Sequence, residues 1–192
     1  MKYSLLFVAI LSFDAFADLN VELANKSEKE QLKYSQLKRV EKTYDLSKWQ
    51  FTDKVVIDDS AKRPHSHPKL TLTVSMPKND GAFLSQYLHE QIHWFEDSRK
   101  TEVQNVINDL KIKYPDAPTK GPEGARSKLS TYLHLAVCLL EYDALTEVLG
   151  EEKAHKIIST NSKYFYKWIY KKILTEPDVI RDILVKHNLY IE

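Results

Sequence analysis

The chain has 192 residues, of which 28 are basic and 27 acidic, so its formal net charge is +1. This balance gives no global basis for binding nucleic acid or a lipid surface, and we expect neither a nucleic-acid partner nor a stable membrane anchor. Hydrophobic residues make up 43% of the chain, enough to build the core of one domain. The single cysteine, Cys138, excludes an intramolecular disulfide, so stability must come from packing and from any bound metal.

The amino terminus has the pattern of a secretory signal peptide. Lys2 is followed by a short apolar run, and Ala15 and Ala17 form a small-residue cleavage site. The run is too short for a membrane span. We therefore predict a signal peptide over residues 1–17, a single domain over residues 18–192, and a secreted or periplasmic protein.

The first part of the predicted domain combines one helix with a small sheet. Residues 26–43 are highly charged with apolar residues at helical spacing, which indicates a helix with a solvated face. Residues 54–58 and 70–74 read as two short strands. His65 and His67 lie between these strands, and as a His-x-His pair they could bind a metal. Two flanking prolines and the lack of an acidic partner favour an exposed loop instead.

The most informative motif is His89-Glu90-Gln91-Ile92-His93. Apolar residues recur at intervals of three and four from residue 82, which predicts an amphipathic helix that carries the motif. Histidines four apart lie on one face of a helix and can bind one metal ion, as the H-E-x-x-H pattern of zinc hydrolases requires. Glu90 would then lie beside the metal without ligating it, placed to accept a proton from water. The alternative is a surface helix whose histidines are solvated by chance.

A catalytic zinc ion usually needs a third protein ligand. The metzincin extension does not supply it, because Glu96 stands where that pattern has glycine and Arg99 where it has the third histidine. Residues 127–149 form a second long helical pattern that is apolar on nearly every side, which predicts a core helix. It carries His134 and Glu141, and seven residues at about 100° each bring these two side chains to nearly the same direction.

A buried carboxylate is costly unless it is paired or bound to a metal, so we predict Glu141 as the third ligand with His89 and His93. His134 would face the same cavity as a transition-state hydrogen-bond donor or as an alternative ligand. Two simpler interpretations remain open. Glu141 could form a buried salt bridge, and His134 could be a core histidine with its hydrogen bonds satisfied.

With these residues the chain resembles the gluzincin type of zinc metallopeptidase, which has H-E-x-x-H on one helix and a glutamate on a later helix. The resemblance covers about residues 70–149 and implies a mainly α, α+β zincin-like domain with a Zn²⁺ cofactor. It departs from the pattern at position 145, where some gluzincins carry an aspartate that orients a zinc-bound histidine and this chain has leucine. Asp143, the acid nearest to this position, and Asp97, four residues after His93, are the candidates for this orienting role.

The resemblance also implies that the strand before the motif helix is an edge to which a substrate peptide adds. In this chain the edge would consist of Leu70, Thr71, Leu72, Thr73 and Val74.

The carboxy-terminal third is predicted to be helical. Gly150 is placed to end the core helix, and further helices are expected over residues 153–158, 162–174 and 177–185. Aromatic and lysine residues alternate over residues 164–170. On a helix this pattern is typical of a core stripe whose lysines extend to solvent, although it can also stack on sugars or nucleic acid.

The expected function is a secreted or periplasmic zinc metallopeptidase with Glu90 as general base and a peptide or protein as substrate, including cell-wall peptide. A hydrogen-bond donor to the transition state could come from His134, Tyr132 or a tyrosine within residues 164–170. Two other classes of protein remain open. One is a non-catalytic periplasmic protein that keeps the helix pair for metal binding or structure, and the other is a binding or inhibitor module in which the motif occurs by chance.

Overall fold

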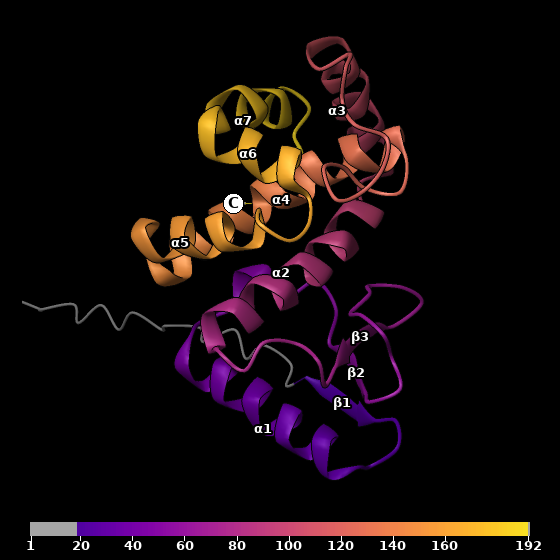
Figure 1. Ribbon diagram of the computed structural model, residues 1–192, viewed down its shortest axis with the longest axis vertical. Coiled ribbons are helices and arrows are strands. Elements are labelled where there is room, and N and C mark those ends of the chain that lie inside the picture. The colour runs from indigo at the N-terminus through magenta and orange to yellow at the C-terminus, as the bar shows by residue number, and fades with distance from the viewer. Residues whose placement is uncertain (1–18, 192) are drawn as a thin grey trace, which may run out of the picture.

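The computed structural model describes residues 19–191 (Figure 1), so the predicted signal peptide lies outside the described residues. In chain order the elements are β1 (Asn20–Leu23), α1 (Glu28–Thr43), a short 3₁₀ helix η1 (Ser47–Trp49), β2 (Lys54–Asp58), β3 (Leu70–Thr73), α2 (Asp80–Asp97), α3 (Lys100–Lys113), α4 (Lys128–Leu149), α5 (Glu151–Asn161), α6 (Lys167–Thr175) and α7 (Pro177–Lys186). This arrangement confirms a mainly helical α+β class. Within residues 19–191, every helix is too short or too polar to cross a lipid bilayer.

The sheet has three parallel strands in the order β1-β2-β3. Helix α1 connects β1 to β2 and packs on both strands, so the three elements form a β-α-β unit. Ser27 begins α1 with a reciprocal capping box, in which its side chain accepts from the backbone of Glu30 and the Glu30 carboxylate accepts from the backbone of Ser27. The sequence did not predict β1, whereas β2 and β3 lie where they were expected.

Strand β3 is at one edge of the sheet, but this edge is not open. The backbone N–H of Thr71 donates to the carbonyl of His65 (2.8 Å), and the N–H of His65 donates to the carbonyl of Thr71 (3.1 Å). Thr71 is therefore paired on both sides, with β2 and with His65. The prediction of a free substrate edge over Leu70, Thr71, Leu72, Thr73 and Val74 is therefore wrong at Thr71, and Val74 lies in a turn beyond the strand.

Helix α4 is the central element of the helical part of the molecule (Figure 1). It packs against α2, α3, α5, α6 and α7. This position explains why its sequence is apolar on nearly every side. Ser127 caps its start by accepting from the backbone of Ser130, and Gly150 ends it with a φ of 86°, a left-handed value that favours glycine.

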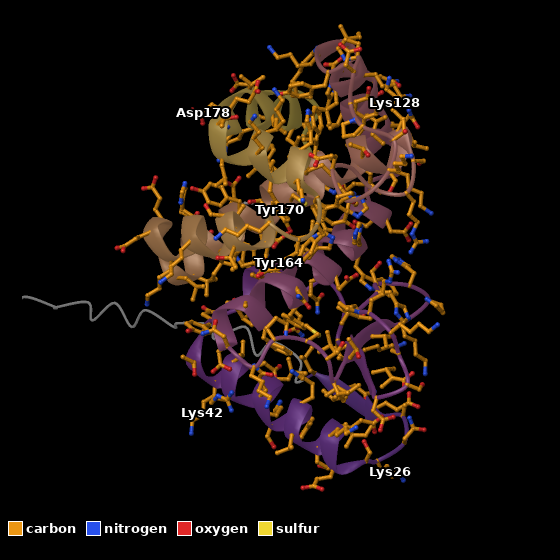
Figure 2. All side chains as sticks on the ribbon, in the orientation of Figure 1. Lys26, Lys42, Lys128, Tyr164, Tyr170 and Asp178 are labelled. Atoms are coloured by element: carbon orange, nitrogen blue, oxygen red, sulfur yellow. The ribbon has the colours of Figure 1, made fainter. Side chains whose placement is uncertain are left out.

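The segment before α6 differs from the prediction. The helix begins at Lys167 rather than at residue 162, because Tyr166 adopts a left-handed backbone conformation with φ 50° and ψ 36°. The aromatic side chains of this region divide between surface and interior: Tyr164 is 71% exposed and Tyr170 only 1%. Figure 2 places Lys26 and Asp178 near the outer edge of the molecule and Tyr170 near its centre.

Candidate metal centre

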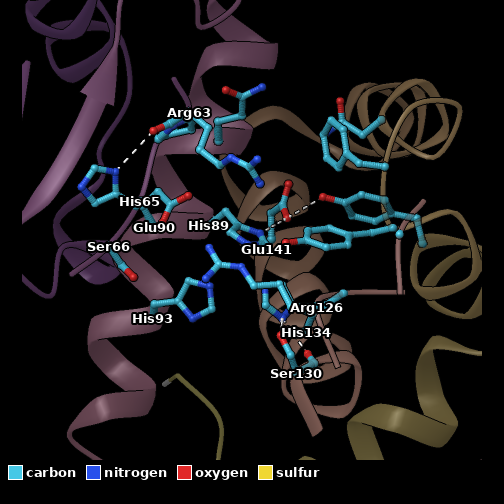
Figure 3. Close-up of a pocket in the computed structure, with 18 of the residues that line it drawn as sticks. Arg63, His65, Ser66, His89, Glu90, His93, Arg126, Ser130, His134 and Glu141 are labelled. Atoms are coloured by element: carbon cyan, nitrogen blue, oxygen red, sulfur yellow. Dashed lines mark hydrogen bonds and ion pairs between the residues drawn. The ribbon is translucent and has the colours of Figure 1, made fainter. Parts of the chain in front are cut away.

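Three histidines converge in a cleft between α2 and α4 (Figure 3). The ring centroids of His89 and His93 are 5.1 Å apart, those of His89 and His134 5.5 Å, and those of His93 and His134 5.2 Å. One ring nitrogen from each lies within 4.8 Å of the others, a spacing at which the three could hold one metal ion. The motif helix thus supplies two imidazoles and the core helix supplies the third.

Each of these imidazoles has an oxygen atom beside its Nδ1 atom. Nδ1 of His134 lies 2.7 Å from the carbonyl oxygen of Ser130, and Nδ1 of His89 lies 2.9 Å from Oε2 of Glu141. Nδ1 of His93 forms a longer ion-pair contact of 3.4 Å with Oε2 of Glu96. A carbonyl or carboxylate oxygen accepts, so the rings of His89 and His134 donate from Nδ1 and keep the Nε2 lone pair for a ligand, whereas His93 has only the ion-pair contact with Glu96. This arrangement is typical of metal-bound histidine.

The electrostatic environment keeps two of the imidazoles neutral, which is the form that binds metal. Burial, together with the neighbouring His93, lowers the pKa of His89 to about 4. Burial and the two neighbouring histidines lower the pKa of His134 to about 3. Burial alone would lower the pKa of His93 as well, but contact with Glu96 and the charges of Glu90 and Glu141 raise it above its ordinary value.

Glu141 lies at this centre, as the sequence predicted, but both of its oxygens have hydrogen-bonding partners. Oε1 accepts from the hydroxyl of Ser85 (2.5 Å), and Oε2 accepts from His89 and from the hydroxyl of Tyr170 (3.1 Å). Burial raises its pKa to about 7, although the hydrogen bonds from Ser85 and Tyr170 partly offset this effect. These contacts suit a carboxylate that orients His89 better than one that binds the metal directly.

The two acids considered for the orienting role lie elsewhere. Asp143 forms a salt bridge with Arg181 (2.6 Å), and Asp97 contacts Lys100 (3.1 Å) and His67 (3.8 Å). The prediction for Asp97 and Asp143 is therefore wrong, because neither side chain reaches a histidine of the cluster. Glu96, one position before Asp97, makes the contact with His93 instead.

Glu90 faces the same cleft, which has a volume of about 700 Å³. Its side chain forms no hydrogen bond or ion pair with any described residue, so the carboxylate is available to a bound molecule (Figure 3). His65 also lines the cleft but is exposed, and neither His65 nor His67 belongs to a metal-capable group in the described part of the chain. This agrees with the expectation of an exposed loop.

One tyrosine of the cleft has a free hydroxyl. The ring of Tyr166 lies 4.7 Å from that of His134 and 6.0 Å from that of His89, and among residues 19–191 its hydroxyl has no hydrogen-bonding partner. Burial raises its pKa, so it remains a donor at neutral pH. The hydroxyl of Tyr132 donates instead to the carbonyl of Tyr114 (2.8 Å), and that of Tyr170 donates to Glu141. Of the tyrosines considered as donors, Tyr166 fits best.

Sequence reasoning missed Glu96 and two arginines of the cleft, Arg63 and Arg126. The only available signal for Glu96 was its position three residues after His93 on the same helix, which puts the two side chains on one face. No comparable signal was available for the arginines, because both lie on loops.

The chain matches no protein-family model, and neither a curated protein nor a solved structure shows significant similarity to it. The described part of the chain thus brings together three imidazoles that could hold one metal ion and one carboxylate, that of Glu90, without a hydrogen-bonding partner in the same cleft.

Proposed function

We propose that this protein is a zinc-dependent metallopeptidase whose metal ligands are His89, His93 and His134. The convergence of three imidazoles, each with an oxygen beside Nδ1, supports this ligand set most strongly. Glu141 then acts as the partner that orients His89, and His134 has the role that the sequence analysis left as its alternative. As part of the same proposal, the fold is assigned to the zincin-like class.

A zinc ion held by three protein ligands supplies Lewis acidity and lowers the pKa of water to about 7. Glu90 is next to the ligand His89 and unpaired, so its carboxylate can accept the proton that the attacking water loses. The same carboxyl group then passes that proton to the leaving amine. Burial of the imidazoles and their contacts with Ser130, Glu141 and Glu96 restrain the rings in the cleft.

In this proposal, Tyr166 donates a hydrogen bond to the carbonyl oxygen as negative charge develops on it. Its backbone is held in the left-handed conformation by its neighbours. The N–H of Lys167 donates to the carbonyl of Pro122, and the N–H of Trp168 donates to the carbonyl of Glu123, both at 3.0 Å. A non-glycine residue in this conformation costs about 1–3 kcal/mol, and such strain is concentrated at functional sites.

Tyr166→Phe is therefore expected to lower kcat for peptide hydrolysis about a hundredfold, because it removes one donor to the developing oxyanion. KM, zinc content and Tm should stay close to the wild-type values, since the hydroxyl has no partner among the described residues. The matched control is Tyr164→Phe, which changes a tyrosine that is 71% exposed. An unchanged kcat in Tyr166→Phe would assign the donor to another group.

The proposal is tested by metal analysis and a peptide assay on the same preparation. Protein purified without chelator should contain about one equivalent of zinc and should hydrolyse members of a mixed peptide and muropeptide library, with activity lost on chelation and restored by zinc. A zinc content below about a tenth of an equivalent that added zinc does not raise would contradict the metal centre. Full zinc content without hydrolysis of any peptide would favour the non-catalytic alternative.

A further inference from the structure

The arginines of this chain fall into two groups. Arg39, Arg99 and Arg181 each form an ion pair with an acidic side chain. Arg63 and Arg126 form none with any described residue, and these are the two that line the cleft with the histidines. Figure 3 shows both side chains directed toward the histidine cluster, from different segments of the chain.

The loop that carries Arg126 is fixed to the start of α4. The N–H of Ala125 donates to Oγ1 of Thr131 (2.9 Å), and that hydroxyl donates to the carbonyl of Pro118 (2.8 Å). Gly124 is required here, because a Cβ atom would lie 2.5 Å from Oγ1 of Thr131 and 2.8 Å from the oxygen of Pro118. Arg126 thus extends from an anchored backbone, although its side chain is exposed.

The loop that carries Arg63 is fixed to the sheet and to α2. The hydroxyl of Thr73 donates to the carbonyl of Ala61 (2.7 Å), and His65 pairs with Thr71. Beyond Arg63, Nε1 of Trp94 donates to the carbonyl of Ser66 (2.9 Å). The two guanidinium groups therefore extend from two separately anchored loops.

Two acids also line the cleft, but neither forms an ion pair with Arg63 or Arg126 among the described residues. These two acids are Glu90 and Glu141, and the Glu141 carboxylate already accepts from three side chains. Two guanidinium groups and a divalent metal ion would outweigh these two carboxylates and leave the cleft with a positive field that favours an anionic ligand. Guanidinium groups bind carboxylates through strong, often bidentate hydrogen bonds.

We propose that Arg63 and Arg126 bind a carboxylate of the substrate, so that the protein selects peptides with a carboxylate close to the bond that is cleaved. This inference rests on the proposed peptidase function. The carboxylate can be the carboxy terminus of a short peptide or the side chain of an aspartate or glutamate. A cleft of about 700 Å³ has room for a short peptide segment rather than for a folded protein.

Three pools of N-acetylated tetrapeptides test the proposal with the zinc-loaded full chain. The first pool has neutral side chains and a free carboxy terminus, the second has the same sequences with a carboxy-terminal amide, and the third is amidated but contains one aspartate or glutamate. At least one carboxylate pool should be hydrolysed about ten- to a hundredfold faster, as kcat/KM, than the neutral amide pool. Preference for the first pool identifies the terminal carboxylate, and preference for the third identifies the side chain.

Arg63→Gln and Arg126→Gln should each reduce this preference by about tenfold, mainly through KM, because each removes charged hydrogen bonds to the substrate. Arg126→Lys should keep more of the preference than Arg126→Gln, because lysine retains the positive charge but lacks the planar guanidinium group. Arg99→Gln is the matched control: it removes one charge outside the cleft and should keep the preference. Equal hydrolysis of all pools by the wild type, or an unchanged preference in both cleft variants, would overturn the inference.

Failure of the proposed function gives a different result. If the zinc-loaded wild type hydrolyses no pool, carboxylate binding is tested by equilibrium dialysis, which measures how much of each peptide pool the protein retains. Retention of a carboxylate pool that is lost in Arg63→Gln and Arg126→Gln supports carboxylate binding by a non-catalytic protein. Equal retention of all three pools contradicts it.

Discussion

His134→Ala is expected to reduce bound zinc from about one equivalent to less than about a tenth, because it removes one of three proposed ligands. Peptide hydrolysis should be lost with the metal. The increase in stability that zinc gives should also disappear. At a zinc concentration a thousand times Kd this increase is about 4 kcal/mol, which is about 8–16 °C in Tm for a chain of this length. Metal analysis and thermal unfolding with and without added zinc measure both effects.

Glu141→Gln distinguishes a ligand from an orienting group. Its side chain keeps the shape of the original but loses the charge that faces His89, so zinc should bind about 10- to 100-fold more weakly and still saturate the site. His65→Ala changes an exposed histidine at the edge of the cleft and should keep both zinc and stability. If zinc were lost from Glu141→Gln and kept by His134→Ala, the ligand set predicted from the sequence would be correct instead.

Glu90→Gln is expected to lower the rate of peptide hydrolysis by about two to four orders of magnitude, because the amide cannot accept the proton of the attacking water. Zinc content should be unchanged, since Glu90 belongs to no metal-capable group in the described part of the chain. The fold should also persist, because no described side chain depends on the Glu90 carboxylate for a hydrogen bond.

Gln86→Glu helps to interpret this result, because Gln86 lines the cleft one helical turn before Glu90. If any carboxylate on this face could act as the base, adding Gln86→Glu to the Glu90→Gln variant would restore activity. We expect no restoration, since a general base must lie within hydrogen-bonding reach of the proton that it removes. Full activity in Glu90→Gln would remove Glu90 from the mechanism.

The helices that carry the site could be predicted because their signals are local. The motif lies on α2, and Asn79 caps this helix by accepting from the backbone of Ala82. The seven-residue spacing of His134 and Glu141 correctly placed both side chains in one cleft. Their division of roles could not be predicted, because it depends on hydrogen bonds to Ser85 and Tyr170 from other elements.

Other features were missed because tertiary contacts determine them. Strand β1 has only four residues, and an alternation of polar and apolar residues this short does not distinguish a strand from a loop. The covered edge of β3 depends on the return of the chain at His65, which no pattern around Thr71 indicates. The late start of α6 depends on the conformation of Tyr166, whose neighbours are bonded to the carbonyls of Pro122 and Glu123.

The division of the three histidines between α2 and α4 has a consequence for the lifetime of the folded protein. The imidazoles face one another only after α4 has docked on α2, so the set of ligands is complete only once this contact has formed. A metal ion that binds such a set stabilises the native state without stabilising any transition state that precedes docking. If docking follows the transition state, bound metal therefore slows unfolding and leaves the folding rate unchanged. In an environment that contains proteases, the supply of metal would then govern how long a folded molecule survives rather than how quickly it forms.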